Sequence, residues 1–272
     1  MTSSSERVFS IDRFANNFKS AIEWMLVSRH GAEIERSIRS FIENKIELES
    51  NPDSPRALKF LVELIVTQAW YYRKPSDFDE KMNAFIDKFG ANFRTQQGKK
   101  ELVNLVTSLA HQRIKSRVKE MLEGILRYSS IKQFTEELYK LAVQGRTIVL
   151  GEKGRDNYLR NFGYWDRIPM DRHEMRFVVR TGIYHACSAN ARSDPLQKAS
   201  LHDALTRFCF KYLKDYTVFG IDLGSAPGIV DIFIWSFCSK KRYNICGSTP
   251  RCEKCLLKKT CLYAIVNTFI YK

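Results

Sequence analysis

The sequence contains no apolar run approaching the roughly 20 residues that a membrane-spanning helix needs. Its first residues lack the apolar core of a signal peptide, so we expect no export. Period-2 alternation bounded by turn residues is also missing, and there is no internal repeat or low-complexity tract. These absences predict a soluble, globular protein without an appreciable β-sheet.

Helical periodicity dominates the chain. Apolar residues such as Phe14, Phe18 and Ile22 recur at helical spacing, and similar stripes follow along most of the sequence. The 272 residues allow one large or two modest domains, and a hydrophobic share of 44% is ordinary for a globular protein. We therefore predict an all-α fold.

Capping residues locate three helix starts. Ser54-Pro55 combines an N-cap serine with a proline at the first helical position. Ser130 followed by Gln133 has the pattern of a capping box. Ser225 and Pro227 open a further helix, which leads directly into a cysteine-rich loop near the end of the chain.

The protein is strongly basic, with a net charge of +14 and a sequence pI near 9.5. Half of that excess lies in residues 239–272, where eight Lys and Arg residues accompany one acid, Glu253. This density of positive charge favours a polyanionic partner, because neutralising phosphates releases counterions. We expect nucleic acid rather than a membrane surface.

Four of the seven cysteines fall within sixteen residues of this basic segment, with the spacing C-x5-C-x2-C-x5-C. They are Cys246, Cys252, Cys255 and Cys261. Four thiolates held this closely can bind an iron–sulfur cluster or a tetrahedral zinc ion. Without export, the thiols stay in a reducing compartment, where cysteines serve metals rather than disulfides. Cys187, Cys209 and Cys238 are then buried or bystander thiols.

Residues 149–164 have the pattern of a tight glycine turn followed by a helix. The unpaired backbone N–H groups at such a helix start bind phosphate well. Lys153 lies in the turn, and Asp171 follows eighteen residues later, at the expected start of the next helix. A carboxylate can stabilise positive charge on a reacting sugar, and a neutral lysine amine can attack the sugar carbon.

These segments resemble the helix-hairpin-helix DNA glycosylase superfamily, in particular endonuclease III and archaeal 8-oxoguanine glycosylases. The family has an L-G-x-K turn, a helix similar to F-L-R-N-x-G and an aspartate in V-D-T-H or I-D-R-H. The matching segments here are Leu150-Gly-Glu-Lys153, Tyr158-Leu-Arg-Asn-Phe-Gly163 and Met170-Asp-Arg-His173. The separation of eighteen residues is the one that endonuclease III uses, and the first gap of the cysteine loop is one residue shorter than usual. Leu61–Gln68 resembles the family's apolar helix that ends in a glutamine, and the resemblance covers most of the chain from about Leu58.

The turn departs from the family pattern G-x-G-x-K-T-A at two places. Val149 stands at the first glycine, and Gly154-Arg155 replaces the Thr-Ala pair. A side chain at Val149 limits how closely the turn can approach a phosphate. The departure therefore bears on DNA affinity more than on the chemistry.

The resemblance implies a two-lobed fold, with a six-helix lobe over residues 55–168 and a cluster lobe formed by residues 1–54 and 169–272. It implies a bifunctional DNA glycosylase and abasic-site lyase of base-excision repair, with an oxidised base as the first expected substrate. Lys153 would be the nucleophile and Asp171 the electrostatic stabiliser, and the four loop cysteines would bind a [4Fe–4S] cluster. The implied DNA contacts are Gln68 as the wedge that fills the gap of the extruded base, with Gly151, Gly154, Arg155, Arg251, Lys254, Lys258 and Lys259.

The expected partner is double-stranded DNA with a damaged base or an abasic site, bound by a monomer in a reducing intracellular compartment (in a prokaryote, the nucleoid-containing cytoplasm). Three alternatives stay open. The protein could be a monofunctional mismatch glycosylase in which Lys153 only binds DNA, a catalytically silent damage-binding protein, or a zinc-containing RNA-binding module. The presence of both Lys153 and Asp171 favours an enzyme over silent binding.

Overall fold

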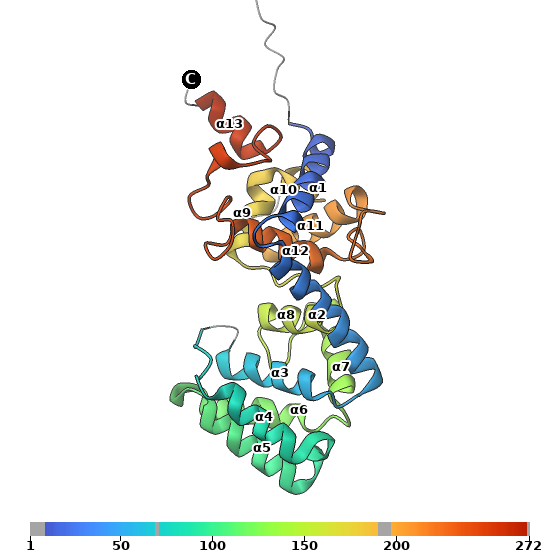
Figure 1. Ribbon diagram of the computed structural model, residues 1–272, viewed down its shortest axis with the longest axis vertical. Helices are drawn as coiled ribbons and strands as arrows, with labels where there is room; N and C mark the ends of the chain where they lie inside the picture. Colours follow the sequence, from blue (N-terminus) through green and yellow to red (C-terminus); the bar gives the residue numbers. More distant parts are fainter. Residues whose placement is uncertain (1–8, 69–70, 190–196, 271–272) are drawn as a thin grey trace, which may run out of the picture. The chain divides into compact units, whose positions relative to one another are not determined.

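The computed structural model describes residues 9–68, 71–189 and 197–270 (Figure 1). In these ranges nearly all regular structure is helical, which confirms the predicted all-α class. The strands found there are β1 (Thr217–Val218) and β2 (Ile221–Asp222), which form a short antiparallel hairpin. Among the described residues, no helix combines the length and the apolar character needed to cross a membrane.

The chain divides into two compact units, which we call the central unit (Ser40–Pro169) and the terminal unit (Met1–Arg39 with Met170–Lys272). The central unit contains α3 (Pro55–Thr67), α4 (Phe78–Phe89), η1 (Gly90–Arg94), α5 (Gln96–Leu109), η2 (Gln112–Ile114), α6 (Lys115–Ile125), α7 (Ile131–Val143) and α8 (Glu152–Asn161). The terminal unit contains α1 (Ile11–Val27), α9 (Arg172–Thr181), α10 (Ile183–Cys187), α11 (Lys198–Tyr212), the β1–β2 hairpin, α12 (Pro227–Cys238), η3 (Cys252–Lys254) and α13 (Leu262–Ile270). Helix α2 (Gly31–Ser50) belongs partly to each unit.

The later division falls between residues 169 and 170, and the earlier one falls inside α2, between residues 39 and 40. The lobes implied by the resemblance divide after residues 54 and 168. The second half of α2 packs with the central unit. Leu48 is 4% exposed in its core, the Arg160 guanidinium lies 5.2 Å from the ring centroid of Phe41, and the Lys45 amine lies 5.2 Å from that of Trp165. Side-chain packing therefore sets the boundary, and the turn at residues 51–54 does not.

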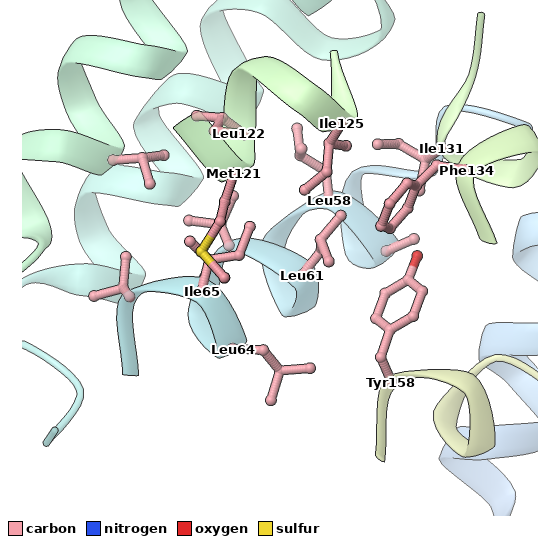
Figure 2. Close-up of a cluster of buried hydrophobic side chains, with 14 of the residues drawn as sticks. Leu58, Leu61, Leu64, Ile65, Met121, Leu122, Ile125, Ile131, Phe134 and Tyr158 are labelled. Carbon is pink, nitrogen blue, oxygen red and sulfur yellow. The ribbon is translucent and has the colours of Figure 1, made fainter. Parts of the chain in front are cut away.

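Helix α3 is the middle helix of the central unit and packs against α5, α6 and α8. Ser54 caps it by accepting a hydrogen bond from the Ala57 N–H (3.1 Å), and Pro55 follows at the first helical position, as predicted. Figure 2 shows Leu58, Leu61 and Ile65 among side chains from α6 and α7. Burial of this apolar face of α3 supplies most of the stabilisation that a helix of this length lacks on its own.

Aromatic rings fill the core of the terminal unit. Phe14 and Phe18 from α1 lie against Phe177 of α9 and Phe208 of α11, with ring centroids 5.5–6.3 Å apart. All four side chains are fully buried. Helix α9 also packs against α10, α12 and α13, so it is the element that most others in this unit contact.

The other two predicted helix starts have different outcomes. Ser130 accepts a hydrogen bond from the Gln133 N–H (3.0 Å) as expected, but Gln133 accepts from the Ser129 N–H (2.7 Å), so the capping box is shifted by one residue on one side. The expectation for Ser225 is wrong. Its hydroxyl bonds to the Asp222 carbonyl in the hairpin, and α12 begins at Pro227 without a side-chain cap.

We expect Tyr158→Phe to lower the free energy of unfolding by about 1 kcal/mol, as measured by urea titration. Tyr158 and Thr135 are fully buried, and their hydroxyl groups are 2.8 Å apart. The substitution keeps the ring packing and removes only this hydrogen bond. Tyr71→Phe is the control, because Tyr71 is 90% exposed, and it should change the free energy by less than about 0.5 kcal/mol. Equal effects of the two substitutions would contradict the assigned hydrogen bond.

Candidate active site and cysteine loop

Helix α8 begins at a turn that gives its first backbone N–H groups no side-chain cap. Gly151 is the N-cap residue, in an extended conformation (φ −67°, ψ 162°), and it has no side chain that could accept a hydrogen bond there. Lys153 is partly buried in the first helical turn, next to the exposed Glu152. Such a helix start carries a partial positive charge and attracts anions. The predicted glycine turn followed by a helix is confirmed.

Val149, which stands where the resembled family has glycine, adopts a left-handed backbone conformation with a φ of 64°. This conformation favours glycine and costs about 1–2 kcal/mol for a residue with a side chain. Val149 packs partly against the core of the central unit, and the Thr147 hydroxyl donates to the Leu150 carbonyl beside it. The turn thus keeps a glycine-like backbone, with a side chain added at its surface.

Two predicted contacts on α8 are buried. Gly154 lies inside, and Arg155 is 6% exposed. The Arg155 guanidinium donates to both carboxylate oxygens of Asp156 (2.8 and 3.0 Å) and to the Arg146 carbonyl (2.6 Å). These bonds engage the guanidinium within the central unit, so Gly151 is the exposed residue among the three predicted contacts of this segment.

Gln68 ends α3, as the sequence predicted, and adopts a left-handed conformation with a φ of 44°. Its backbone N–H donates to the carbonyls of Ile65 and Leu64, and its side-chain Nε2 lies 3.4 Å from the Met121 sulfur. The side chain therefore stands where the chain turns away from a buried helix. Residues 69 and 70, which follow, lie outside the described ranges.

Asp171 is the N-cap of α9 and forms a complete capping box with Glu174. The Asp171 Oδ1 accepts a hydrogen bond from the His173 N–H (2.6 Å), and the Glu174 Oε2 accepts one from the Asp171 N–H (2.9 Å). Because both bonds are made, the partly buried Asp171 carboxylate has a fixed position in the terminal unit. The sequence predicted this helix start but missed Glu174, which the capping-box spacing could have identified.

Glu174 and Asp231 of α12 form a buried acidic pair, 1% and 3% exposed. Burial is the main cause that raises the pKa of Glu174 well above its usual range, followed by the nearby charges of Asp231 and Asp171. The protonated form of Glu174 is therefore favoured. A proton on Glu174 limits the negative charge that accumulates beside Asp171.

Arg180, near the other end of α9, binds the cysteine loop. Its guanidinium donates to the carbonyls of Gly247 (2.5 Å) and Ser248 (3.0 Å), with Nη1 4.0 Å from the Cys246 sulfur. The Cys261 thiol donates to the Arg180 carbonyl (3.4 Å). One helix thus connects the candidate catalytic carboxylate to the loop, and no sequence motif signalled this role for Arg180.

The four loop cysteines are free thiols, with Cys246 and Cys261 buried and Cys252 and Cys255 partly buried. In the part of the chain that the structure describes, no group of three or more His, Cys, Asp or Glu side chains has the arrangement of a metal site. A hydrogen bond from Cys238, assisted by Arg180, lowers the pKa of Cys246 to about 7.

Burial raises the pKa of Cys255 to about 12 and that of Cys261 to about 11. A bound metal would favour the thiolate forms instead. The donor set itself, four cysteines on one short loop, fits the ligand chemistry of an iron–sulfur cluster or zinc. The cluster stays a prediction.

The predicted phosphate contacts of the cysteine loop are all at the surface. Arg251, Lys254, Lys258 and Lys259 are exposed, and within the described ranges none of them forms an ion pair. Their charges are therefore available to a polyanion. Lys153 belongs to the central unit and Asp171 to the terminal unit.

No protein-family model matches the chain, and neither does any curated protein or any solved structure.

We expect Glu174→Gln to flatten the pH dependence of stability, as measured by urea unfolding from pH 5 to pH 8. A raised pKa means that folded Glu174 retains a proton that the unfolded chain releases. The protonated side chain therefore contributes its full stabilisation at low pH, and this stabilisation is lost as pH rises through the folded pKa. The free energy of unfolding of the wild type should therefore fall with rising pH relative to that of the variant, by at most about 1.4 kcal/mol per pH unit. Glu80→Gln, at an exposed site, is the control. A constant difference across the range would exclude proton retention.

Proposed function

We propose that the protein is a DNA glycosylase with abasic-site lyase activity that removes a damaged base from duplex DNA. The proposed substrate is an oxidised base. The observation that carries this proposal is the Asp171 carboxylate, held by its capping box at the start of α9. The partly buried Lys153 in the uncapped first turn of α8 supports it. A fixed carboxylate and a lysine beside an anion-attracting turn are the groups that this chemistry needs.

The proposed reaction assigns a separate step to each group. As the bond between the base and C1′ of the sugar breaks, Asp171 stabilises the positive charge that develops on the sugar. The Lys153 amine forms a bond to C1′ through its nitrogen lone pair and gives up a proton, while the base leaves with the electron pair of the broken bond and takes up a proton. Ring opening gives a Schiff base, loss of a C2′ proton expels the 3′ phosphate, and water then releases Lys153.

DNA binding would use the surface features of both units. The uncapped start of α8 and Gly151 would contact phosphate, and so would the exposed Arg251, Lys254, Lys258 and Lys259 of the cysteine loop. The target base has to leave the stack before it can react, and Gln68 would fill the gap. These contacts would be made by a monomer.

Cys246, Cys252, Cys255 and Cys261 would hold a [4Fe–4S] cluster. When bound, the cluster would cross-link the loop through iron–sulfur bonds and so fix its basic side chains. Arg180 would contribute by binding the loop carbonyls of Gly247 and Ser248. The role proposed for the cluster is structural, and the catalytic steps are assigned to Lys153 and Asp171.

We expect freshly purified protein to be brown and to contain about four irons per chain, as measured by metal analysis. Cys246→Ser should lower the iron content, whereas Cys209→Ser should leave it unchanged, because Cys209 is buried in α11 away from the loop sequence. A colourless protein with one zinc per chain would contradict the cluster.

Catalysis is tested on oligonucleotides that carry thymine glycol, 8-oxoguanine, uracil or an abasic site. Borohydride should trap the wild-type protein covalently on DNA, because reduction stabilises the Schiff base. Lys153→Ala should abolish trapping and strand cleavage. Asp171→Asn should slow base release by about 10²-fold, the usual loss for a group that stabilises transition-state charge, while asparagine still caps the helix.

Matched controls come from surface residues with other roles. Lys140→Ala changes an exposed lysine of α7, and Asp203→Asn changes an exposed carboxylate of α11; both should retain full activity. If Lys153→Ala is still trapped by borohydride, another amine is the nucleophile. Base release without trapping by the wild type would indicate a monofunctional glycosylase, and binding without either would indicate a silent damage-binding protein.

A further inference from the structure

A basic hollow lies between α5 and α6 of the central unit, two helices that pack directly against each other. Its volume is about 460 Å³, within the range of small-ligand pockets. The hollow is lined by Lys99, Lys100, Val103 and Asn104 of α5, by Lys119 and Glu123 of α6, and by Leu126 and Arg127 just beyond it. None of these residues belongs to the α8 turn or the cysteine loop.

The charges around the hollow are not balanced. Four cationic side chains accompany one carboxylate, which leaves a formal excess of three positive charges. Glu123 is 3.9 Å from Lys119, and both side chains are about half exposed. In the part of the chain that the structure describes, Lys99, Lys100 and Arg127 have no ion pair.

Several other lysines of the central unit have carboxylate partners, although Lys115 and Lys132 have none within the described ranges. Lys59 pairs with Asp79 (2.8 Å), Lys81 with Asp77 (2.6 Å) and Lys88 with Glu101 (3.0 Å). Glu101 lies on α5, the helix that carries Lys99 and Lys100, but it pairs with Lys88 of α4. Unneutralised cations that gather at one concave place lower the potential energy of a multiply charged anion there more than scattered charges do.

The remaining lining residues indicate the kind of anion. The Asn104 amide can donate to and accept from polar groups, and Val103 and Leu126 supply apolar surface. Ligands with two or more phosphate groups match this combination, because their charge is spread over a length comparable to a hollow of this size. Lysine and arginine are the side chains that proteins use for such groups.

We propose that the hollow between α5 and α6 binds the phosphates of a nucleic-acid backbone, as a second contact region separate from the α8 turn. A free polyphosphate has the same chemistry, so the experiment distinguishes the two sources. The inference concerns binding alone and holds for undamaged DNA. It therefore does not depend on base removal by Lys153 and Asp171.

The test compares two triple variants in which the same number of positive charges is removed. Lys99→Gln, Lys100→Gln and Arg127→Gln together neutralise the hollow, and Lys59→Gln, Lys81→Gln and Lys88→Gln together neutralise paired lysines of the same unit. Affinity for an undamaged DNA duplex is measured at several salt concentrations. The slope of log K against log salt should fall by about one for each phosphate that the protein no longer neutralises, and so by about three in the first variant, with little change in the second.

Inorganic triphosphate, titrated by calorimetry into the same three proteins, supplies the second arm. A reduced salt slope for DNA supports the nucleic-acid backbone as the ligand. An unchanged DNA slope, with triphosphate binding abolished in the first variant alone, assigns the hollow to a free polyphosphate instead. Equal behaviour of the two variants toward both probes, with equal thermal stability, would overturn the proposal.

Discussion

The capping box between Asp171 and Glu174 is the interaction on which the proposed chemistry depends. It fixes the catalytic candidate by two backbone hydrogen bonds, 2.6 and 2.9 Å long, at the start of α9. The same helix reaches the cysteine loop through the hydrogen bonds of Arg180 to the Gly247 and Ser248 carbonyls. A preorganised carboxylate needs no rearrangement when charge develops, which is why a rigid helix start suits it.

Burial of Glu174 is the least expected part of this arrangement, because a cap residue on a helix start is usually solvated. Its proximity to Asp231 places two carboxyl groups in one apolar environment, where ionisation of both is unfavourable. A retained proton offsets that conflict. It also leaves Asp171 as the carboxylate of this group with access to the surface. Three acids in one place can thus have different roles because their burial differs.

Positive charge has a different distribution in each unit. In the terminal unit one group of cations without ion pairs lies on the cysteine loop, close in sequence, whereas in the central unit one such group comes from two helices that pack together around a hollow. Both arrangements leave charge unneutralised while other lysines of the protein have carboxylate partners. These two groups therefore supply part of the net charge of +14 in a form that can meet a polyanion.

The sequence by itself determined the helical class, the cap at Ser54, the start of α9 at Asp171 and the turn before Lys153. Periodicity and capping involve neighbours within a few residues, so these features could be predicted. Ser225 failed as a cap because the hairpin before it engages its hydroxyl. Only the tertiary structure decided the unit boundary within α2, the burial of Arg155 and Glu174, and the binding of Arg180 to the cysteine loop. These depend on interactions between segments distant in the chain or on the packing of whole helices, which no local pattern records.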